Sequence, residues 1–162
     1  MLNASLSTRP RRRAQAGFTL AELVTVAAVM AVLALVSLPV AKFTLKRSKE
    51  ADLRLALRQM RSAIDEYKHY SDAGLIAIDL GTEGYPKKLD VLVEGVAIVG
   101  QVDKKLKLLR RIPVDPMTGK DEWGLRSYQD EFDSTSWGGE NVFDVYSLSQ
   151  GVGLNNIPYR KW

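Results

Sequence analysis

One carboxylate lies inside a stretch of the chain that is otherwise free of charge. Glu22 is followed by Leu23–Ala41, 19 residues without a charged side chain. This length is close to the ~20 apolar residues that cross the hydrocarbon core of a bilayer. A carboxylate in such a segment costs about 2.5–3.5 kcal/mol on insertion scales, and groups of this kind are usually paired. No basic residue lies one helical turn from Glu22, so its counter-charge must come from elsewhere.

The peptide bond between Gly17 and Phe18 marks the boundary between polar and apolar residues. Cleavage after Gly17 would create an α-amine on Phe18, at the depth where Glu22 needs a cation. That amine could neutralise Glu22 of its own chain or of a neighbouring copy. The spacing therefore predicts a cleavage site at Gly17–Phe18 and an ion pair at Glu22.

The first 17 residues account for the net positive charge of +4 at pH 7. They hold four arginines and no acid, and the remaining chain has 19 basic and 19 acidic residues. By the positive-inside rule, this basic flank stays in the cytoplasm and the downstream residues face outward. The neutral remainder weakens a nucleic-acid-binding interpretation, because phosphate binding needs clustered positive charge on the folded part.

A long helix must carry these residues. Helix-forming residues continue from Phe18 to Tyr70, a length of about 80 Å at ~1.5 Å per residue. Pro39 interrupts the apolar half and predicts a kink or a local loss of helical order. After Lys42 the helix becomes amphipathic, with one apolar stripe facing a small core. The stripe consists of Leu53, Ala56, Leu57, Met60, Ala63, Ile64 and Tyr67.

Shorter elements are predicted in the rest of the chain. They are a helix stop at 71–74, a short helix at 87–94, a helical turn at 104–111, and strands at 125–131 and 141–148. The aromatic tail at 158–162 either packs against the preceding loop or frays. The pattern predicts an α+β fold, in which a long helix packs on a small antiparallel sheet.

The segment Gly17-Phe18-Thr19-Leu20-Ala21-Glu22, after a basic leader, resembles the class III signal of type IV pilins and type II secretion pseudopilins. In that family a membrane aspartyl peptidase, the prepilin peptidase, cuts after the glycine and N-methylates the new terminal residue. The resemblance implies cleavage after Gly17, methylation of Phe18 and an assembly role for Glu22. Pro39 falls where the family commonly has a helix-distorting proline.

The same resemblance implies a type IV pilin-like organisation. Residues 1–17 would be a leader, 18–42 a transmembrane helix that later forms filament core, and 43–162 a periplasmic head. Before assembly the chain would cross the bacterial inner membrane once, with its N-terminus in the cytoplasm.

Two simpler interpretations of the N-terminus stay open. The chain could be a plain signal anchor in which Glu22 has no partner, or it could carry a cleaved secretory signal. The small-x-small pattern at 14–16 lies before the apolar run, however, and the one at 39–41 begins with a proline. Neither is a good site for signal peptidase.

Three head segments resemble the major pseudopilin of type II secretion systems. They are Gly84-Tyr85-Pro86, the stretch LRRIPVDP at 109–116 and the stretch FDVYSL at 143–148. The resemblance implies a non-enzymatic subunit that polymerises, with its own copies and other pseudopilins, on an inner-membrane assembly platform. The resulting periplasmic filament drives protein export. The alternative within the same family is a type IV pilus fibre subunit for adhesion, motility or DNA uptake.

The same resemblance raises the question of calcium. Major pseudopilins usually bind Ca²⁺ in the loop after the last strand, and Ca²⁺ takes about six to eight oxygen ligands. Here that loop, 149–157, has no acidic residue, and Asp144 is the only carboxylate nearby. We therefore predict no cofactor, and weak calcium binding through asparagine and carbonyl oxygens stays open as the alternative. The chain also lacks cysteine, which excludes cysteine-based metal sites and nucleophiles.

Enzyme and nucleic-acid hypotheses find little support among the residues. His69 is the only histidine, and Asp65 and Glu66 are adjacent on a helix and point apart. No phosphate-binding loop or nucleophile-elbow motif is present, so no catalytic residue and no metal ligand is predicted. A basic run could serve a DNA-uptake pilin, although such a run is usually a solvated helix face. It consists of Lys104, Lys105, Lys107, Arg110 and Arg111.

Replacing Gly17 with a bulky residue, as in Gly17→Leu, should leave the precursor unprocessed, because the peptidase would lose the small residue before the scissile bond. Mass spectrometry of the protein purified from membranes should then find residues 1–17 still attached. Protein of mature size from this variant would refute cleavage between Gly17 and Phe18.

Overall fold

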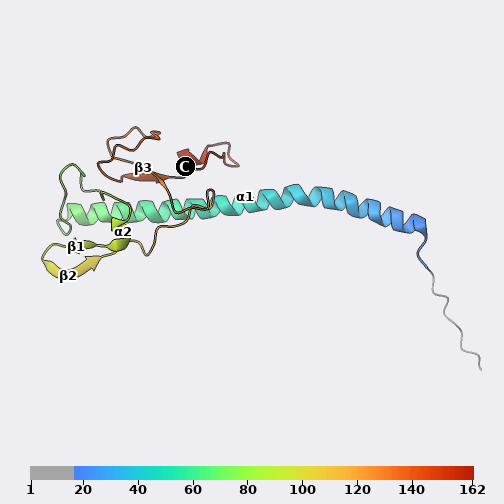
Figure 1. Cartoon of the computed structure of the whole chain (residues 1–162), viewed down its shortest axis with the longest axis horizontal. Helices are drawn as coiled ribbons and strands as arrows, with labels where there is room; N and C mark the ends of the chain where they lie inside the picture. The colour runs from blue at the N-terminus through green and yellow to red at the C-terminus, as the bar shows by residue number, and fades with distance from the viewer. Residues whose placement is uncertain (1–16) are drawn as a thin grey trace, which may run out of the picture. The chain divides into compact units, whose positions relative to one another are not determined.

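The structure, a computed structural model, describes residues 17–162, apart from the side chains of residues 36–39 and 102–103. Its main element is the helix α1, Leu20–Asp72, which confirms the predicted long helix to within two residues at each end (Figure 1). The chain divides within α1 into two compact units, one ending at Lys42 and the other comprising Phe43–Trp162. The second unit is called the head below.

Helix α1 ends at the predicted stop. Gly74 has a φ of 71°, in the left-handed region that glycine adopts without strain. Its N–H donates to the Ser71 carbonyl at 3.0 Å, and the Leu75 N–H donates to the Tyr70 carbonyl at 3.0 Å. These two bonds form a Schellman motif, which satisfies carbonyls at the helix end and turns the chain back toward the head.

The apolar stripe on the second half of α1 forms one wall of the core, as predicted. Every residue of the predicted stripe is buried, and Leu53, Met60 and Ile64 are completely inaccessible. Their partners come from later in the chain and include Ile76, Leu89, Leu92, Trp123, Val142, Val145 and Tyr159. Such a stripe gains most of its helical stability from tertiary packing of this kind.

A short helix and a hairpin follow α1. The helix α2 spans Val91–Glu94 and covers only the second half of the short helix predicted at 87–94. The strands β1, Val96–Ile98, and β2, Gln101–Leu106, pair antiparallel and form the hairpin.

The helical turn predicted at 104–111 is wrong, since its first residues belong to β2. Gly100 has a φ of 82°, which lets two residues connect β1 to β2. Across the hairpin Val96 lies opposite Leu106, and both side chains pack against the core. Pairing across the hairpin therefore overrides the helical preference of the lysine-rich segment.

The second strand pair joins β3, Gly124–Arg126, to β4, Asp144–Tyr146, again antiparallel. Both strands are shorter than the strands predicted at 125–131 and 141–148. Each predicted strand therefore exists, but most of its length is irregular.

Side chains end the β3–β4 ladder early. The Ser127 N–H donates to the Asp130 carboxylate at 2.7 Å, and the Tyr128 N–H donates to Asn141 Oδ1 at 2.9 Å. In a longer strand these backbone N–H groups would donate to the neighbouring strand. Here the side chains of Asp130 and Asn141 accept from them instead, as short polar side chains commonly do in turns.

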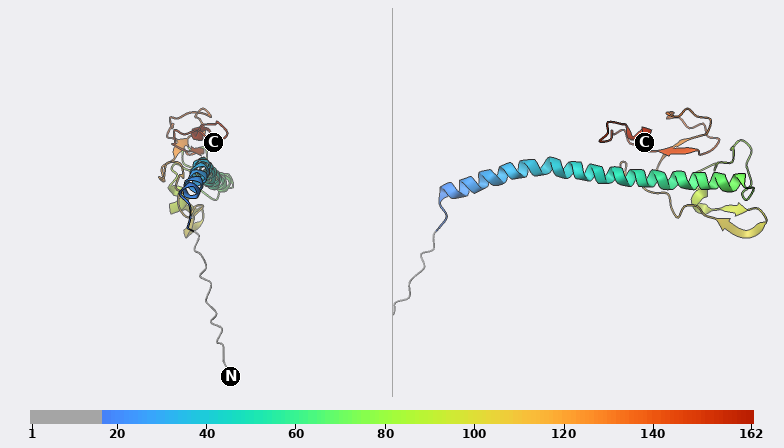
Figure 2. Two further views of the ribbon diagram at one scale, coloured as in Figure 1. Left: turned by 90° about the vertical axis from the view of Figure 1, so that its right-hand side faces the viewer. Right: turned by 180° about the vertical axis from the view of Figure 1, so that it is seen from behind.

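The two strand pairs lie on different sides of the second half of α1, as Figures 1 and 2 show. They remain separate sheets of two strands each, ordered β1–β2 and β3–β4. The head is therefore α+β, with a long helix packed against small antiparallel sheets, as predicted. The difference is that two small sheets take the place of one.

The aromatic tail packs rather than frays. The 3-10 helix η1, Tyr159–Lys161, leaves Tyr159 only 3% exposed. The Tyr159 and Trp162 rings meet edge to face, with 5.1 Å between their centroids. The Arg54 guanidinium of α1 lies 4.5 Å from the centre of the Trp162 ring, a cation–π contact. Of the two alternatives for the tail, packing is correct.

The replacement Gly124→Ala should destabilise the head by about 3 kcal/mol, because it overpacks a filled site. The added Cβ would meet three ring atoms of Tyr146 at 2.2, 2.3 and 2.6 Å, and the Arg126 guanidinium stacks 4.2 Å from that ring. Chemical unfolding followed by tryptophan fluorescence measures the loss. In the control Gly119→Ala the new methyl meets open space, and only the left-handed backbone, at φ 75°, costs about 1 kcal/mol. Equal losses in the two variants would contradict the packing argument.

Stability should fall at high pH through Tyr159. Its hydroxyl donates to Glu50 Oε1 at 3.0 Å, and burial together with this hydrogen bond raises the pKa of Tyr159 to about 12. In the unfolded chain the phenol has a pKa of about 10. Because the folded-state pKa is the higher one, the phenol's contribution is complete below about pH 10 and is lost as the pH rises toward about 12.

In this alkaline window the unfolding free energy of Tyr159→Phe should therefore depend less on pH than that of the wild type. Denaturant titrations at a series of pH values compare the two slopes. If the unfolding free energies of the two proteins depended equally on pH, folding would not raise the pKa of Tyr159.

Candidate processing site and head motifs

The start of α1 is capped by a residue of the candidate signal. Thr19 precedes the first helical residue, and its Oγ1 accepts a hydrogen bond from the Glu22 N–H at 3.2 Å. The Thr19 carbonyl accepts from the Leu23 N–H at 3.1 Å. Thr-x-x-Glu is the order of a capping box, and Glu22 lies in the first turn, where the helix dipole favours a negative charge. This second role of Glu22 was not predicted, although the Thr-x-x-Glu spacing in the sequence is its signal.

The large apolar side chains in the first half of α1 lie exposed around the helix. They are Leu20, Leu23, Val24, Val26, Val29, Met30, Val32, Leu33, Leu35 and Val40. Within the described residues, α1 is the one helix long and apolar enough to cross a membrane. A helix that is apolar all round requires lipid or other helices as its surroundings.

Gly17 has no structural reason to be glycine in the described chain. It is exposed, its backbone is outside the left-handed region, and an added Cβ would meet no atom within 4 Å. The adjoining Phe18 is 76% exposed. Cleavage at this bond and methylation of Phe18 remain predictions, and the rest of the predicted leader, residues 1–16, lies outside the described residues.

The remaining predicted site residues stay untested. Glu22 forms no ion pair within the part of the chain that the structure describes. The predicted partner is the Phe18 amine, which exists only after cleavage, so this pair is still a prediction. Helix α1 continues past Pro39, whose side chain is among those outside the description, and the predicted distortion there is also still a prediction.

The Gly-Tyr-Pro segment at 84–86, which the sequence singled out, meets the start of the segment 143–148. The Pro86 carbonyl accepts a hydrogen bond from the Val142 N–H at 2.8 Å. The Tyr85 ring lies edge-on to Phe143, with 5.3 Å between centroids, and stacks on Tyr128 at 5.9 Å. The Gly-Tyr-Pro segment thus packs directly beside the strand β4.

The segment 109–116 reaches the same region through Asp115, which is completely buried. Asp115 Oδ2 accepts from the Ser147 hydroxyl at 2.6 Å, and Oδ1 accepts from the Met117 N–H at 2.8 Å. The Trp123 indole N–H donates to the Pro113 carbonyl at 2.8 Å. The head motifs therefore tie loops to the β4 segment, which is a structural role.

Asp144 on β4 is held by two arginines. Its Oδ1 accepts from Arg61 Nε at 2.7 Å, and its Oδ2 accepts from Arg126 Nη1 at 3.1 Å. Arg61 also donates to the carbonyls of Val145 and Trp162. From the sequence, Asp144 was considered as a possible calcium ligand, and neither arginine was predicted as its partner. No local signal could have found Arg61, which is 83 residues away on α1.

The residues weighed for catalysis lie on the surface of α1. His69 is exposed, with its ring 6.2 Å from that of Tyr70. Asp65 and Glu66 are exposed as well. In the described part of the chain, no group of three or more histidine, aspartate or glutamate side chains could hold a metal ion.

Comparison with known proteins concerns the N-terminus. Residues 12–38 match the family described as the prokaryotic N-terminal methylation motif. Comparisons with curated proteins and with solved structures found no match. The matched stretch contains Gly17, Phe18 and Glu22 together with most of the exposed apolar half of α1. The chain therefore carries a type IV pilin-like prepilin signal at the start of a pilin-like α+β fold.

Proposed function

We propose that this chain is a structural subunit of a type II secretion pseudopilus. Prepilin peptidase cuts it after Gly17 and methylates Phe18, and the mature subunits polymerise into a periplasmic helical filament that drives protein export. One observation carries the subunit role: the methylation motif at residues 12–38 extends into the first half of α1, where the large apolar side chains are exposed.

The apolar half of α1 serves two environments in turn. In the inner membrane its side chains are covered by lipid, with the head on the periplasmic side. In the filament they are covered by the same helices of neighbouring subunits. Since lipid tails are as apolar as leucine, this exchange is driven by close packing and by any polar pair that it completes.

Glu22 supplies that polar pair. After cleavage Thr19 still caps α1, and the new Phe18 amine adds a positive charge at a helix end where the dipole disfavours it. The Glu22 carboxylate of a neighbouring subunit offsets this charge. An unpaired carboxylate in an apolar core is costly, so the pair also fixes the axial register between subunits.

The secretion branch is supported by the head. The segments that resemble major pseudopilins hold the β4 region together through Pro86, Tyr85 and Asp115. The partners then are prepilin peptidase, other pseudopilins and an inner-membrane platform. A type IV pilus fibre subunit is the alternative. Neighbouring genes for a secretin and further pseudopilins favour secretion, and genes for pilus retraction favour the fibre.

A DNA-uptake role is supported less well. Lys104 and Lys105 are exposed neighbours on β2, and successive side chains of a strand point to opposite faces. The basic run therefore lacks the single helical face on which a phosphate-binding interpretation depends.

Two replacements at Glu22 separate pairing from capping. Glu22→Val removes the charge and the capping group, whereas Glu22→Gln removes the charge but keeps a residue that suits a capping box. If the charge acts in assembly, both variants should insert in the membrane at wild-type levels and lose at least roughly ten-fold in filament yield. Sedimentation of sheared filaments, with the membrane fraction as a control for insertion, measures both quantities. Normal filament yield from Glu22→Gln would remove the ion-pair mechanism.

A further inference from the structure

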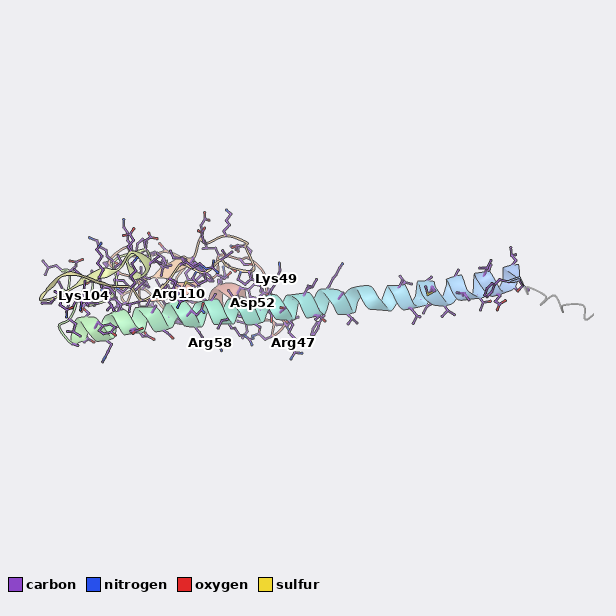
Figure 3. The ribbon with its side chains drawn as sticks, turned by 90° about the horizontal axis from the view of Figure 1, so that it is seen from below. Arg47, Lys49, Asp52, Arg58, Lys104 and Arg110 are labelled. Atoms are coloured by element: carbon purple, nitrogen blue, oxygen red, sulfur yellow. The ribbon has the colours of Figure 1, made fainter. Side chains whose placement is uncertain are left out.

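Glu50 differs from the other charged residues around it on α1. Its neighbours Arg47, Lys49 and Asp52 are exposed, and Figure 3 shows these three side chains labelled along the helix. Glu50 is only 5% exposed. A buried carboxylate is costly unless protein donors satisfy it, so its surroundings reveal its role.

The donors to Glu50 come from the last part of the chain. Its Oε1 accepts from the Leu154 N–H at 2.8 Å and from the Tyr159 hydroxyl at 3.0 Å. One helical turn earlier, Lys46 Nζ donates to the Val152 carbonyl at 2.8 Å. Two α1 residues of opposite charge thus hold the end of the chain after β4. Glu50 binds the Leu154 N–H and the Tyr159 hydroxyl, and Lys46 binds the Val152 carbonyl.

Three further carbonyls of this loop are also occupied. The Gly151 carbonyl accepts from the Tyr159 N–H at 3.1 Å, the Gly153 carbonyl from the Asn156 N–H at 3.0 Å, and the Ile157 carbonyl from the Gly153 N–H at 2.9 Å. These bonds fold the loop on itself before it meets α1.

The residues around this loop do not fit calcium. Ca²⁺ needs about six to eight oxygen ligands, several of them carboxylates. Residues 149–157 provide no carboxylate, and Asp144 is already neutralised by two guanidinium groups. Glu50 is the carboxylate that contacts the loop, and its Oε1 already accepts from the Leu154 N–H and the Tyr159 hydroxyl. The Lys46 ammonium contacts the Val152 carbonyl, where it would repel a divalent cation. This loop therefore lacks a suitable set of ligands for the calcium ion that the resemblance to major pseudopilins suggests.

We propose that Glu50 and Lys46 form a metal-free clamp, which fixes the loop 149–157 and the aromatic tail onto α1 in place of a calcium ion. The clamp lets the head fold and stay folded without divalent cations. The inference concerns the head alone and does not depend on how the N-terminus is processed or which filament the subunit builds.

The first test asks whether the full-length chain in detergent responds to calcium. Its thermal unfolding midpoint should be the same with excess calcium chloride and with excess chelator, and calorimetric titration with calcium chloride should give no heat of binding. A higher midpoint in calcium, or saturable binding, would overturn the proposal.

The second test asks whether Glu50 holds the loop. Hydrogen–deuterium exchange is measured on the full chain in chelator. The backbone amides of 151–159 should exchange several-fold faster in Glu50→Gln than in the wild type, because a neutral amide oxygen accepts hydrogen bonds more weakly than a carboxylate does. The matched control Asp52→Asn removes an exposed carboxylate from the same helix and should leave this exchange unchanged. Exchange in Glu50→Gln equal to that in Asp52→Asn would contradict the clamp.

Two milder variants keep the test decisive if Glu50→Gln does not fold. Tyr159→Phe removes one of the two donors to Glu50 and leaves the Leu154 bond, and Lys46→Met removes only the contact with Val152. Each should speed exchange in 151–159 by a smaller factor. Wild-type exchange in both variants would refute the clamp.

Discussion

The exposed apolar half of α1 is the constraint from which the other features follow. Apart from Glu22 and Thr25, the side chains from Leu20 to Leu35 are apolar and exposed, and a helix of this composition and length is stable only in lipid or among other helices. Its start is fixed by Thr19, one residue after Phe18, so the helix begins almost at the candidate cleavage bond. Cap, carboxylate and candidate amine are therefore concentrated within the first turn.

The head solves a different problem, because two sheets of two short strands bury too little to be stable alone. Its loops are instead tied to α1 and to β4 by buried or half-buried carboxylates. Glu50, Asp115 and Asp144 each accept two or more hydrogen bonds, and at least one donor to each is far away in the chain. A carboxylate satisfied in this way acts as a cross-link, since losing one donor leaves a costly charge behind.

The motif residues of the two units differ in kind. Pro86, Tyr85 and Asp115 make specific contacts inside the head, so these motif residues have a structural role. Gly17 makes no such contact, and nothing in the described chain requires it to be small.

The sequence by itself determined α1 to within two residues, its buried stripe, its stop at Gly74 and the signal around Glu22. Each depends on neighbours a few positions apart, and local spacing records such relations directly. Only the tertiary structure decided the β1–β2 hairpin, the second sheet, and the contacts of Arg61 with Asp144 and of Glu50 with the final loop. The partners of these two pairs are 83 to 109 residues apart. A single Asp, Arg or Glu carries no periodic pattern that names its partner, so folding alone brings them together.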